Sequence, residues 1–288
     1  MTTDYGHLSM PTVLITGASG YVGSRLCGLA PRGTDLWGTR LTRACPAKVN
    51  EIACDLADER SIRDAVSASC PDLVFHLAYD PARPEDIIAQ GTRRLLAALE
   101  SRPGCRIVFL STDAVFDGTS APNSEEDEPR PLTAYGRAKR AAEEMVLSAG
   151  GLVARTSLVY GFLPPDPRSA ALASGLRGAG FPYPFFTDEI RSPVWVDDLC
   201  HGLWALALLP APPEILHLAG PEAVSRHGFA RRLALAWGLD PDSIPAGSLA
   251  DHPAVRPADT SLASGLAGNL LGYSPRTVEQ AVRLCKKP

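Results

Sequence analysis

Short apolar runs alternate with longer amphipathic stretches along the first half of the chain. The runs predict six β-strands, over residues 12–16, 35–39, 50–54, 72–78, 106–111 and 152–155. The stretches between them predict four helices, one ending near residue 29 and the others over residues 58–68, 84–101 and 133–149. Strands that are apolar throughout are typical of parallel sheets with helices on both faces. The pattern therefore predicts an α/β fold with a doubly wound parallel sheet.

The pattern changes after about Gly161. Prolines interrupt the chain at positions 164, 165, 167, 182 and 184, and only two further strands are predicted, over 192–196 and 215–218. Helices are predicted over 197–209, 226–238 and 277–285. We therefore expect residues 161–288 to form a smaller, irregular C-terminal lobe, with segments near 192–209 and 214–219 returning to the sheet of residues 11–160.

Composition narrows the class of protein. The net charge of −4 argues against a nucleic-acid-binding protein, whose surface is usually basic. No apolar run reaches 18 residues and the first ten residues lack a secretory pattern, so neither a membrane protein nor a secreted one is expected. The seven cysteines form no CxxC pair. They predict reduced thiols, no metal site and a cytoplasmic protein.

Three glycines spaced three apart follow the first strand: Gly17, Gly20 and Gly23. Glycines there permit a tight turn, a close approach of the backbone to a pyrophosphate, and close packing of helix on strand. The pyrophosphate would then meet the free N–H groups at the helix N-terminus. Because the motif lies between an apolar strand and a helix, it predicts a dinucleotide-binding Rossmann domain over residues 11–160.

The end of the second strand indicates which dinucleotide is bound. An Asp or Glu there would hold a ribose 2′-OH and favour NAD, but the segment 36–43 has no acid. It carries Arg40 and Arg43, which suit a 2′-phosphate, so the sequence favours NADP(H) over NAD(H). The alternative is that both arginines are solvated on a loop. Asp55, after the third strand, is either an acceptor for the adenine amino group or a solvated turn residue.

Tyr135 and Lys139 are spaced to share one face of a helix. A lysine cation beside a phenol stabilises phenolate, so the tyrosine exchanges a proton more readily near neutral pH. The preceding strand ends in Ser111-Thr112. Hydroxyls at the carboxyl end of a parallel strand point into the crevice where α/β sheets bind ligands, although they also form turns.

The glycine motif, Tyr135-x-x-x-Lys139 and the segment Ser-Thr-Asp-Ala-Val-Phe-Asp-Gly at 111–118 together resemble the extended short-chain dehydrogenase/reductases. Segment 111–118, with Arg256-Pro257 and Ser261-Leu262, is most similar to the dTDP-4-dehydrorhamnose reductase-like, sugar nucleotide-binding family. The similarity runs from about residue 12 to residue 271. Further matches lie at 155–161, 191–199, 217–220 and 224–226.

This resemblance implies a catalytic triad of Thr112, Tyr135 and Lys139. Tyr135 would be the acid or base, Lys139 would bind the nicotinamide ribose, and Thr112 would orient the carbonyl. The predicted substrate contacts are Ser111, Asp113 and Arg191, although Arg191 is equally suited to an ion pair with Asp188 or Glu189. The predicted cofactor contacts are Gly17, Ser19, Gly20, Tyr21, Val22, Gly23, Arg40, Arg43, Asp55, Leu56, Leu77, Ala78, Tyr135 and Lys139.

Two features depart from the family pattern. Many members carry an asparagine three residues before a Gly-Thr pair, where it supports a proton relay; here Ile88 precedes Gly91-Thr92. The segment between Ala78 and Gly91 is also short. Family members commonly form dimers through helices equivalent to 84–101 and 133–149. In this chain those helices carry the apolar residues Leu95, Leu99, Met145 and Val146. These side chains either form a homodimer interface or pack on the sheet.

The resemblance implies three functions. The first is NADP(H)-dependent reduction of a keto group on a nucleotide-activated deoxysugar. The second is a non-catalytic NADP-binding regulatory or scaffold subunit, because the regulatory β subunit of methionine adenosyltransferase resembles the same reductases. The third is a nucleotide-sugar epimerase or dehydratase. Such enzymes usually use NAD, which the second strand disfavours, and a dehydratase commonly has Asp-Glu where this chain has Asp113-Ala114.

Overall fold

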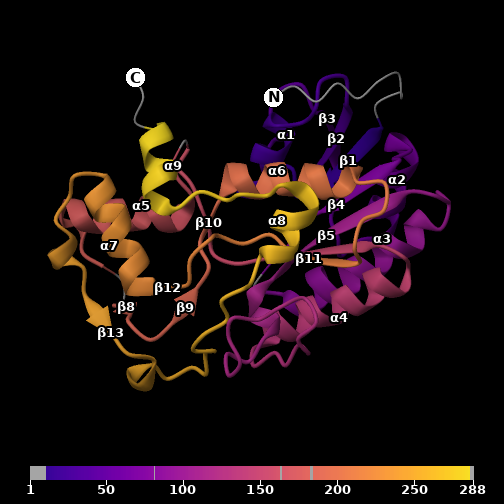
Figure 1. Cartoon of the computed structure of the whole chain (residues 1–288). Helices are drawn as coiled ribbons and strands as arrows, with labels where there is room; N and C mark the ends of the chain where they lie inside the picture. Colours follow the sequence, from indigo (N-terminus) through magenta and orange to yellow (C-terminus); the bar gives the residue numbers. More distant parts are fainter. Residues whose placement is uncertain (1–10, 81, 163, 182–183, 286–288) are drawn as a thin grey trace.

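The computed structural model describes residues 11–80, 82–162, 164–181 and 184–285 (Figure 1). Its centre is a sheet of seven parallel strands. In sheet order these are β11 (Ile215–His217), β6 (Leu152–Thr156), β5 (Arg106–Thr112), β4 (Leu73–His76), β1 (Thr12–Thr16), β2 (Asp35–Arg40) and β3 (Asn50–Ala53). The predicted doubly wound α/β fold is confirmed.

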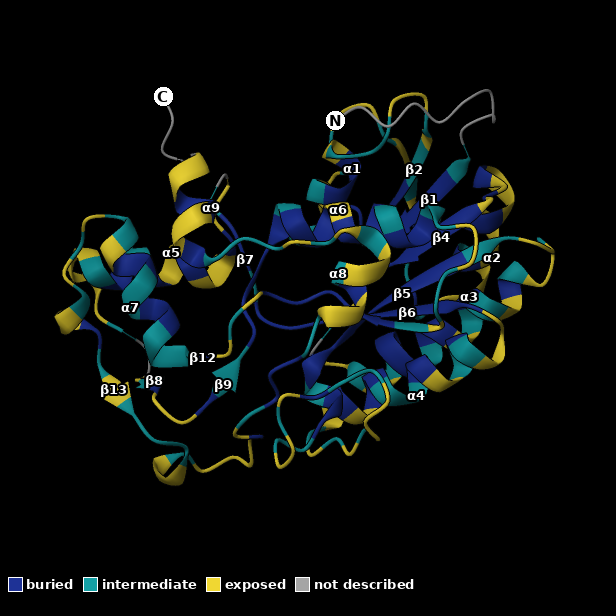
Figure 2. Ribbon diagram, in the orientation of Figure 1, coloured by how far each residue is buried: buried dark blue, intermediate teal, exposed yellow. Residues whose placement is uncertain are grey.

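Helices cover both faces of this sheet. One face carries α1 (Tyr21–Gly28) and α6 (Val196–Leu208), and the other carries α2 (Glu59–Ser69), α3 (Gly91–Leu99) and α4 (Ala134–Ser148). Successive residues of a strand point to opposite faces. Val13 and Ile15 accordingly join the core under α1 and α6, whereas Leu14 joins the core under the other helices. The central strands β1, β4, β5 and β6 are mostly dark blue in Figure 2 because both of their faces are buried, whereas β2 and β3 toward the edge are more exposed.

Local sequence explains where the helices begin. The Asp58 side chain accepts a hydrogen bond from the Arg60 amide and caps α2, and Thr133 caps α4 through the Gly136 amide. The helix predicted over 84–101 is divided: a π-helix, η1 (Pro84–Gln90), precedes α3. Hydrophobic periodicity does not reveal such a change in hydrogen bonding.

The C-terminal half contains more elements than predicted. The expectation of only two strands after residue 161 was wrong, because pairs of two-residue strands have no period to detect. The small strands are β7 (Val159–Tyr160), β8 (Phe185–Phe186), β9 (Ile190–Arg191), β10 (Val194–Trp195), β12 (Val224–Ser225) and β13 (Ala246–Gly247). The further helices are α5 (Pro167–Ser174), η3 (Gly175–Ala179), α7 (Arg226–Ala236), α8 (Gly265–Leu271) and α9 (Val278–Cys285), with 3-10 turns η2 (Asp113–Val115), η4 (Pro241–Ser243) and η5 (Leu249–Asp251).

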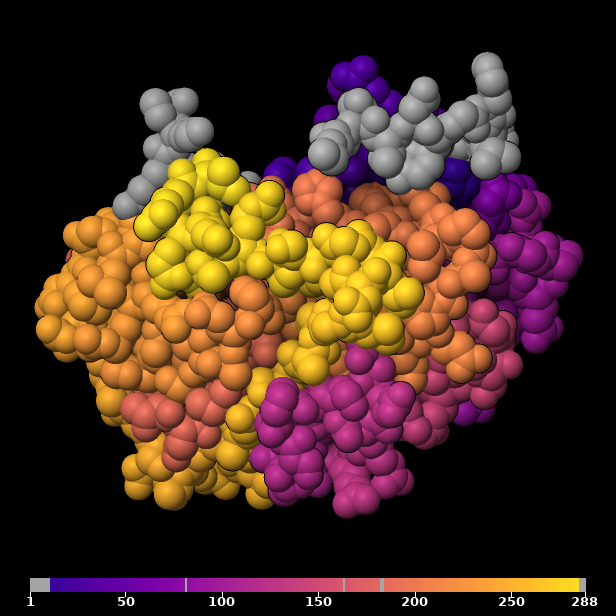
Figure 3. Space-filling model, viewed as in Figure 1, coloured from indigo at the N-terminus to yellow at the C-terminus, as the bar shows by residue number. Residues whose placement is uncertain are grey.

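Segments from the C-terminal half of the chain join the sheet domain to the small lobe. β11 pairs with β6 in the main sheet, and the Trp204 indole on α6 donates to the Leu26 carbonyl on α1. Near the C-terminus, bridges join Asp259 to Ile190 and Leu262 to Asn123. Figure 3 shows the C-terminal segment, in yellow, lying across this face of the molecule. Among the helices in the described part of the chain, none has the length and hydropathy needed to cross a membrane.

Candidate active site

The glycine motif forms the turn between β1 and α1. Gly17 has a φ of +72°, and a Cβ atom at this position would lie 2.9 Å from the Ala78 Cα. A Cβ at Gly23 would lie 2.3 Å from the Gly17 carbonyl oxygen. Gly20 is the N-cap of α1 and makes no side-chain cap, so no side chain covers the first amides of this helix. Only glycine fits this cradle, which suits a pyrophosphate.

The predicted cofactor residues gather at one edge of the sheet. The strand order reverses between β1 and β4, and this switch point is where doubly wound sheets bind ligands. Leu77 and Ala78 follow β4 at this edge, and the buried Leu56 follows β3. The Asp55 carboxylate accepts a hydrogen bond of 2.9 Å from the Ala57 amide, which is the turn interaction that the sequence left as an alternative.

An acidic residue from the next strand lies beside Arg40. The Arg40 Nε donates to Glu51 Oε1 over 2.5 Å, and the Cys45 amide donates to Glu51 Oε2 over 2.6 Å. These hydrogen bonds hold the pKa of Glu51 below its usual range. Arg43 is exposed. Sequence reasoning missed Glu51 because it comes eleven residues after Arg40 and reaches it only through the pairing of β2 with β3.

Tyr135 and Lys139 lie on α4 beside the end of β5. The Lys139 ammonium is buried, donates to the Leu110 carbonyl over 2.7 Å, and lies 4.4 Å from the centre of the Phe109 ring. Burial lowers the pKa of Lys139 to about 7, and the Glu143 charge counteracts this shift. Burial also raises the pKa of Tyr135, and the nearby Thr112 hydroxyl counteracts that rise. At neutral pH the phenol therefore carries its proton.

Tyr79 also belongs to this group, although sequence reasoning did not select it. Its ring is 55% exposed, and its centre lies 6.2 Å from the Tyr135 ring centre and 5.9 Å from the Lys139 ammonium. The only local signal was its place directly after β4, at the edge where ligands bind. It forms one side of the space in front of Tyr135.

Asp113 connects the triad to the small lobe. Its carboxylate accepts hydrogen bonds from the Thr112 hydroxyl at 3.1 Å and the Ser157 hydroxyl at 2.6 Å, and lies 3.7 Å from the Arg191 Nε. Ser111 is buried, and its hydroxyl has no partner among the described residues. Asp113 therefore orients the Thr112 hydroxyl by accepting its hydrogen bond.

Arg191 is held by the protein on several sides. It donates to Glu189 Oε1 over 2.9 Å and to the carbonyls of Ile190, Pro257 and Ala258. Arg256 donates to the same Glu189 oxygen over 2.8 Å. The ion-pair alternative is thus realised with Glu189, whereas Asp188 accepts from the Ser248 hydroxyl and the Leu249 amide.

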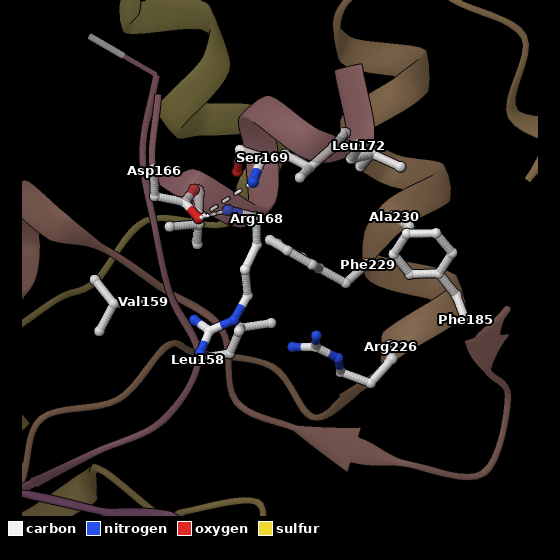
Figure 4. Close-up of a pocket in the computed structure, with 12 residues that line it drawn as sticks. Leu158, Val159, Asp166, Arg168, Ser169, Leu172, Phe185, Arg226, Phe229 and Ala230 are labelled. Atoms are coloured by element: carbon white, nitrogen blue, oxygen red, sulfur yellow. Dashed lines mark hydrogen bonds between the residues drawn. The ribbon is translucent and has the colours of Figure 1, made fainter. Parts of the chain in front are cut away.

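A small pocket of about 20 Å³, open to solvent, lies in the small lobe between α5, α7 and β7. Its wall is apolar except for Asp166, Ser169 and two arginines, Arg168 and Arg226, whose guanidinium groups extend toward the same space beside Leu158 (Figure 4). The Arg168 charge makes a small contribution against the rise in the pKa of Tyr135, which burial dominates. Sequence reasoning assigned neither arginine to a site: Arg226 only ends the family match at 224–226, and no motif marks Arg168.

Asp166 fixes the position of Arg168. Its carboxylate caps α5 by accepting from the Arg168 and Ser169 amides at 2.9 and 3.2 Å, and also accepts from the Gly161 amide at 3.2 Å. The cap therefore joins the end of β7 to the first turn of α5. Arg168 is carried on this turn and is itself exposed at the pocket edge.

A family model described as the RmlD substrate binding domain matches residues 11–288. The chain belongs to this family. The predicted membership is confirmed.

Individual proteins show the same similarity. The dTDP-4-dehydrorhamnose reductase of Mycobacterium tuberculosis is 32% identical over 282 residues, covering 91% of this chain and 88% of that protein. Methionine adenosyltransferase 2 subunit beta of Danio rerio is 25% identical over 264 residues, covering 84% and 80%. The crystal structure of dTDP-4-dehydrorhamnose reductase from Bacillus anthracis in complex with NADP shares the fold, with a TM-score of 0.80 and 22% identity, covering 96% of this chain and 98% of that one.

Proposed function

We propose that this chain is an NADP(H)-dependent reductase of a keto group on a nucleotide-activated deoxysugar. The observation that carries the proposal is the position of Tyr135 and Lys139 on α4, beside Thr112 and the sheet edge that holds the glycine cradle. The relative at 32% identity, named dTDP-4-dehydrorhamnose reductase, supports the same activity.

Each residue of the triad has a distinct task. Tyr135 donates its proton to the substrate oxygen, because its raised pKa keeps the phenol protonated at neutral pH. Lys139 would hold the nicotinamide ribose, and Thr112 would orient the carbonyl. When bound, the nicotinamide supplies the hydride. The glycine cradle and the amides at the start of α1 hold the pyrophosphate.

The preference for NADP(H) over NAD(H) rests on Arg40 and Arg43. Glu51 engages only the Nε of Arg40, and the terminal nitrogens have no partner among the described residues. Those nitrogens are the ones suited to a 2′-phosphate. Glu51 places an acid at this edge as well, so the comparison of the two cofactors is the measurement that decides this part of the proposal.

The substrate would lie between Tyr135 and the pocket of the small lobe. The two guanidinium groups of this pocket, which Asp166 and Ser169 also line, suit the diphosphate of a nucleotide sugar. The exposed Tyr79 ring would flank the sugar on the side of the sheet. Arg191, held by Glu189, would act by keeping the lobe in place beside Asp113.

The direct test uses the purified chain with NADPH and dTDP-4-dehydrorhamnose. Oxidation of NADPH, followed by absorbance, together with a reduced sugar nucleotide in the mass spectrum, is the expected result. Tight NADPH binding without turnover on a panel of keto-sugar nucleotides would instead support the regulatory alternative, to which the 25% identical methionine adenosyltransferase subunit points. Release of an epimerised or dehydrated sugar with no net NADPH oxidation would support the third alternative.

The assembly and compartment complete the proposal. Leu95 and Val146 are fully buried against the sheet, so a homodimer through η1, α3 and α4 would rest on the partly exposed Leu99 and Met145. Light scattering at micromolar concentration distinguishes this dimer from a monomer. Six cysteines are free thiols, which fits the reducing cytoplasm: Cys27, Cys45, Cys54, Cys70, Cys105 and Cys200.

A further inference from the structure

Three buried side chains form a hydrogen-bonded chain beneath the switch point of the sheet. His76 ends β4 and lies opposite Thr16, which ends β1. The Thr16 Oγ1 lies 2.7 Å from His76 Nδ1, and the His76 Nε2 lies 3.0 Å from Thr92 Oγ1. Each of the three residues is at most 1% exposed. No part of the proposed reaction uses them.

The direction of every hydrogen bond in this chain is fixed. The Thr92 hydroxyl donates its single proton to the Ile88 carbonyl over 2.6 Å, so it can only accept from His76. The His76 Nε2 therefore carries a proton. Burial and the nearby Lys139 charge lower the pKa of His76 to about 3, so the ring is neutral and Nδ1 has no proton. Nδ1 must then accept from the Thr16 hydroxyl.

This arrangement leaves the Thr16 oxygen free to accept hydrogen bonds from two backbone amides. Leu77 and Ala78 donate to it over 3.1 and 3.3 Å. The Ala78 backbone is the surface against which Gly17 is packed, since a Cβ on Gly17 would lie 2.9 Å from the Ala78 Cα. These hydrogen bonds thus connect the ends of β1 and β4 at the switch point of the sheet, beside the glycine turn.

We propose that His76, locked as the Nε2–H tautomer between Thr16 and Thr92, is a positioning residue for the nicotinamide cofactor. It acts through the amides of Leu77 and Ala78, and this inference rests on the proposed function. The proposal also involves the segment where Ile88 replaces the asparagine common in the family. The Ile88 backbone carbonyl, and not its side chain, ends the hydrogen-bonded chain at the junction of η1 and α3.

The tautomer is tested without any ligand. In ¹⁵N-detected NMR of the full chain, with the His76 signals assigned by comparison with His76→Phe, Nε2 should be the protonated nitrogen at pH 7. A proton on Nδ1 would overturn the proposal. Because the measurement needs no cofactor, it stands even if the chain binds neither NADPH nor NADH, an outcome that would defeat the proposed function.

The positioning role is tested by cofactor affinity. Thr92→Val has nearly the same shape but loses the hydroxyl, and should weaken NADPH binding about tenfold, the effect of roughly one buried hydrogen bond. Thr92→Ser restores the hydroxyl and should restore the affinity. Val66→Ala makes a cavity in the same core, away from the hydrogen bonds of Thr16, His76 and Thr92. It should lower the melting temperature of the protein without changing the Kd for NADPH. Wild-type affinity in Thr92→Val, or equal weakening in Thr92→Ser and Val66→Ala, would refute the positioning role.

Discussion

Two regions are supported in different ways: the pocket of the small lobe, and the edge of the sheet beside Thr112, Tyr135 and Lys139, which is called the catalytic edge for its proposed role. At the edge, Lys139 is 3% exposed and its ammonium is fixed by the carbonyl of a seven-residue strand. In the lobe, the pocket is bounded by two-residue strands, and Arg168 is exposed on the first turn of a short helix. A long buried strand and α4 hold the three residues of the proposed triad, whereas a helix cap holds the turn that carries Arg168.

Asp113 and Arg191 connect these two regions. Asp113 accepts from Thr112 at the catalytic edge and lies 3.7 Å from Arg191, which Glu189 holds in the lobe. Apart from this link, the proposed triad and the pocket arginines lie on different elements. Substrate recognition and proton transfer are expected to respond to different substitutions for that reason. The predictions below separate the two regions by the quantity that each substitution changes.

The largest effect is expected at the catalytic edge. Tyr135→Phe keeps the ring and removes the proton donor, so turnover should fall by about 10²–10⁴-fold while the Kd for NADPH stays within about twofold. Steady-state kinetics and a cofactor titration measure the two quantities. Tyr273→Phe removes another buried phenol, one with no partner among the described residues, and should leave turnover unchanged. Retained reductase activity in Tyr135→Phe would show that another group supplies the proton.

A smaller effect is expected in the lobe. Arg168→Ala removes one of the two guanidinium groups of the pocket, and should raise KM for the nucleotide sugar about 10- to 100-fold. The NADPH Kd should not change, because the pocket and the glycine cradle are on different elements. The control is Arg177→Ala, an exposed arginine of the same lobe that does not line the pocket. An unchanged KM in Arg168→Ala would remove this pocket from the substrate site.

The next effect concerns the cofactor alone. Arg40→Ala should weaken NADPH about tenfold and leave NADH nearly unchanged, because only NADPH carries the 2′-phosphate. The measurement is a titration of both cofactors into the variant and into Arg32→Ala, an exposed arginine on the preceding loop. Equal weakening of both cofactors, or tighter binding of NADH by the wild type, would contradict the NADP(H) preference.

The last effect is on stability and depends on pH. Burial lowers the pKa of Lys139 from 10.5 to about 7, so between these values the unfolded chain carries a proton that the folded chain lacks. Stability should therefore rise with pH from about 7 to 9, by at most roughly 1.4 kcal/mol per pH unit from this group. Chemical denaturation of the wild type and Lys139→Met across this range measures it. Parallel curves for the two proteins would show that Lys139 does not titrate there.

Features close together in the sequence were predicted from it. The apolar runs predicted the parallel sheet, because strands buried on both faces must be apolar throughout. The glycine motif and the Tyr135–Lys139 pair depend on three- and four-residue spacings, which a turn and a helix convert directly into geometry. The family resemblance added the roles of the triad, and the structure places all three residues beside one another.

Tertiary structure decided the partners of those residues. Glu51 beside Arg40, Arg191 beside Asp113, and Thr92 beside His76 are pairs whose members come from different strands, helices or lobes. Sheet register and loop paths bring them together, and no local periodicity encodes either. The pocket of Arg168 and Arg226 arises in the same way, because α5 and α7 are far apart in the sequence and only the packing of the lobe brings them together. Local spacing thus determines which chemistry is present, and long-range packing determines what surrounds it.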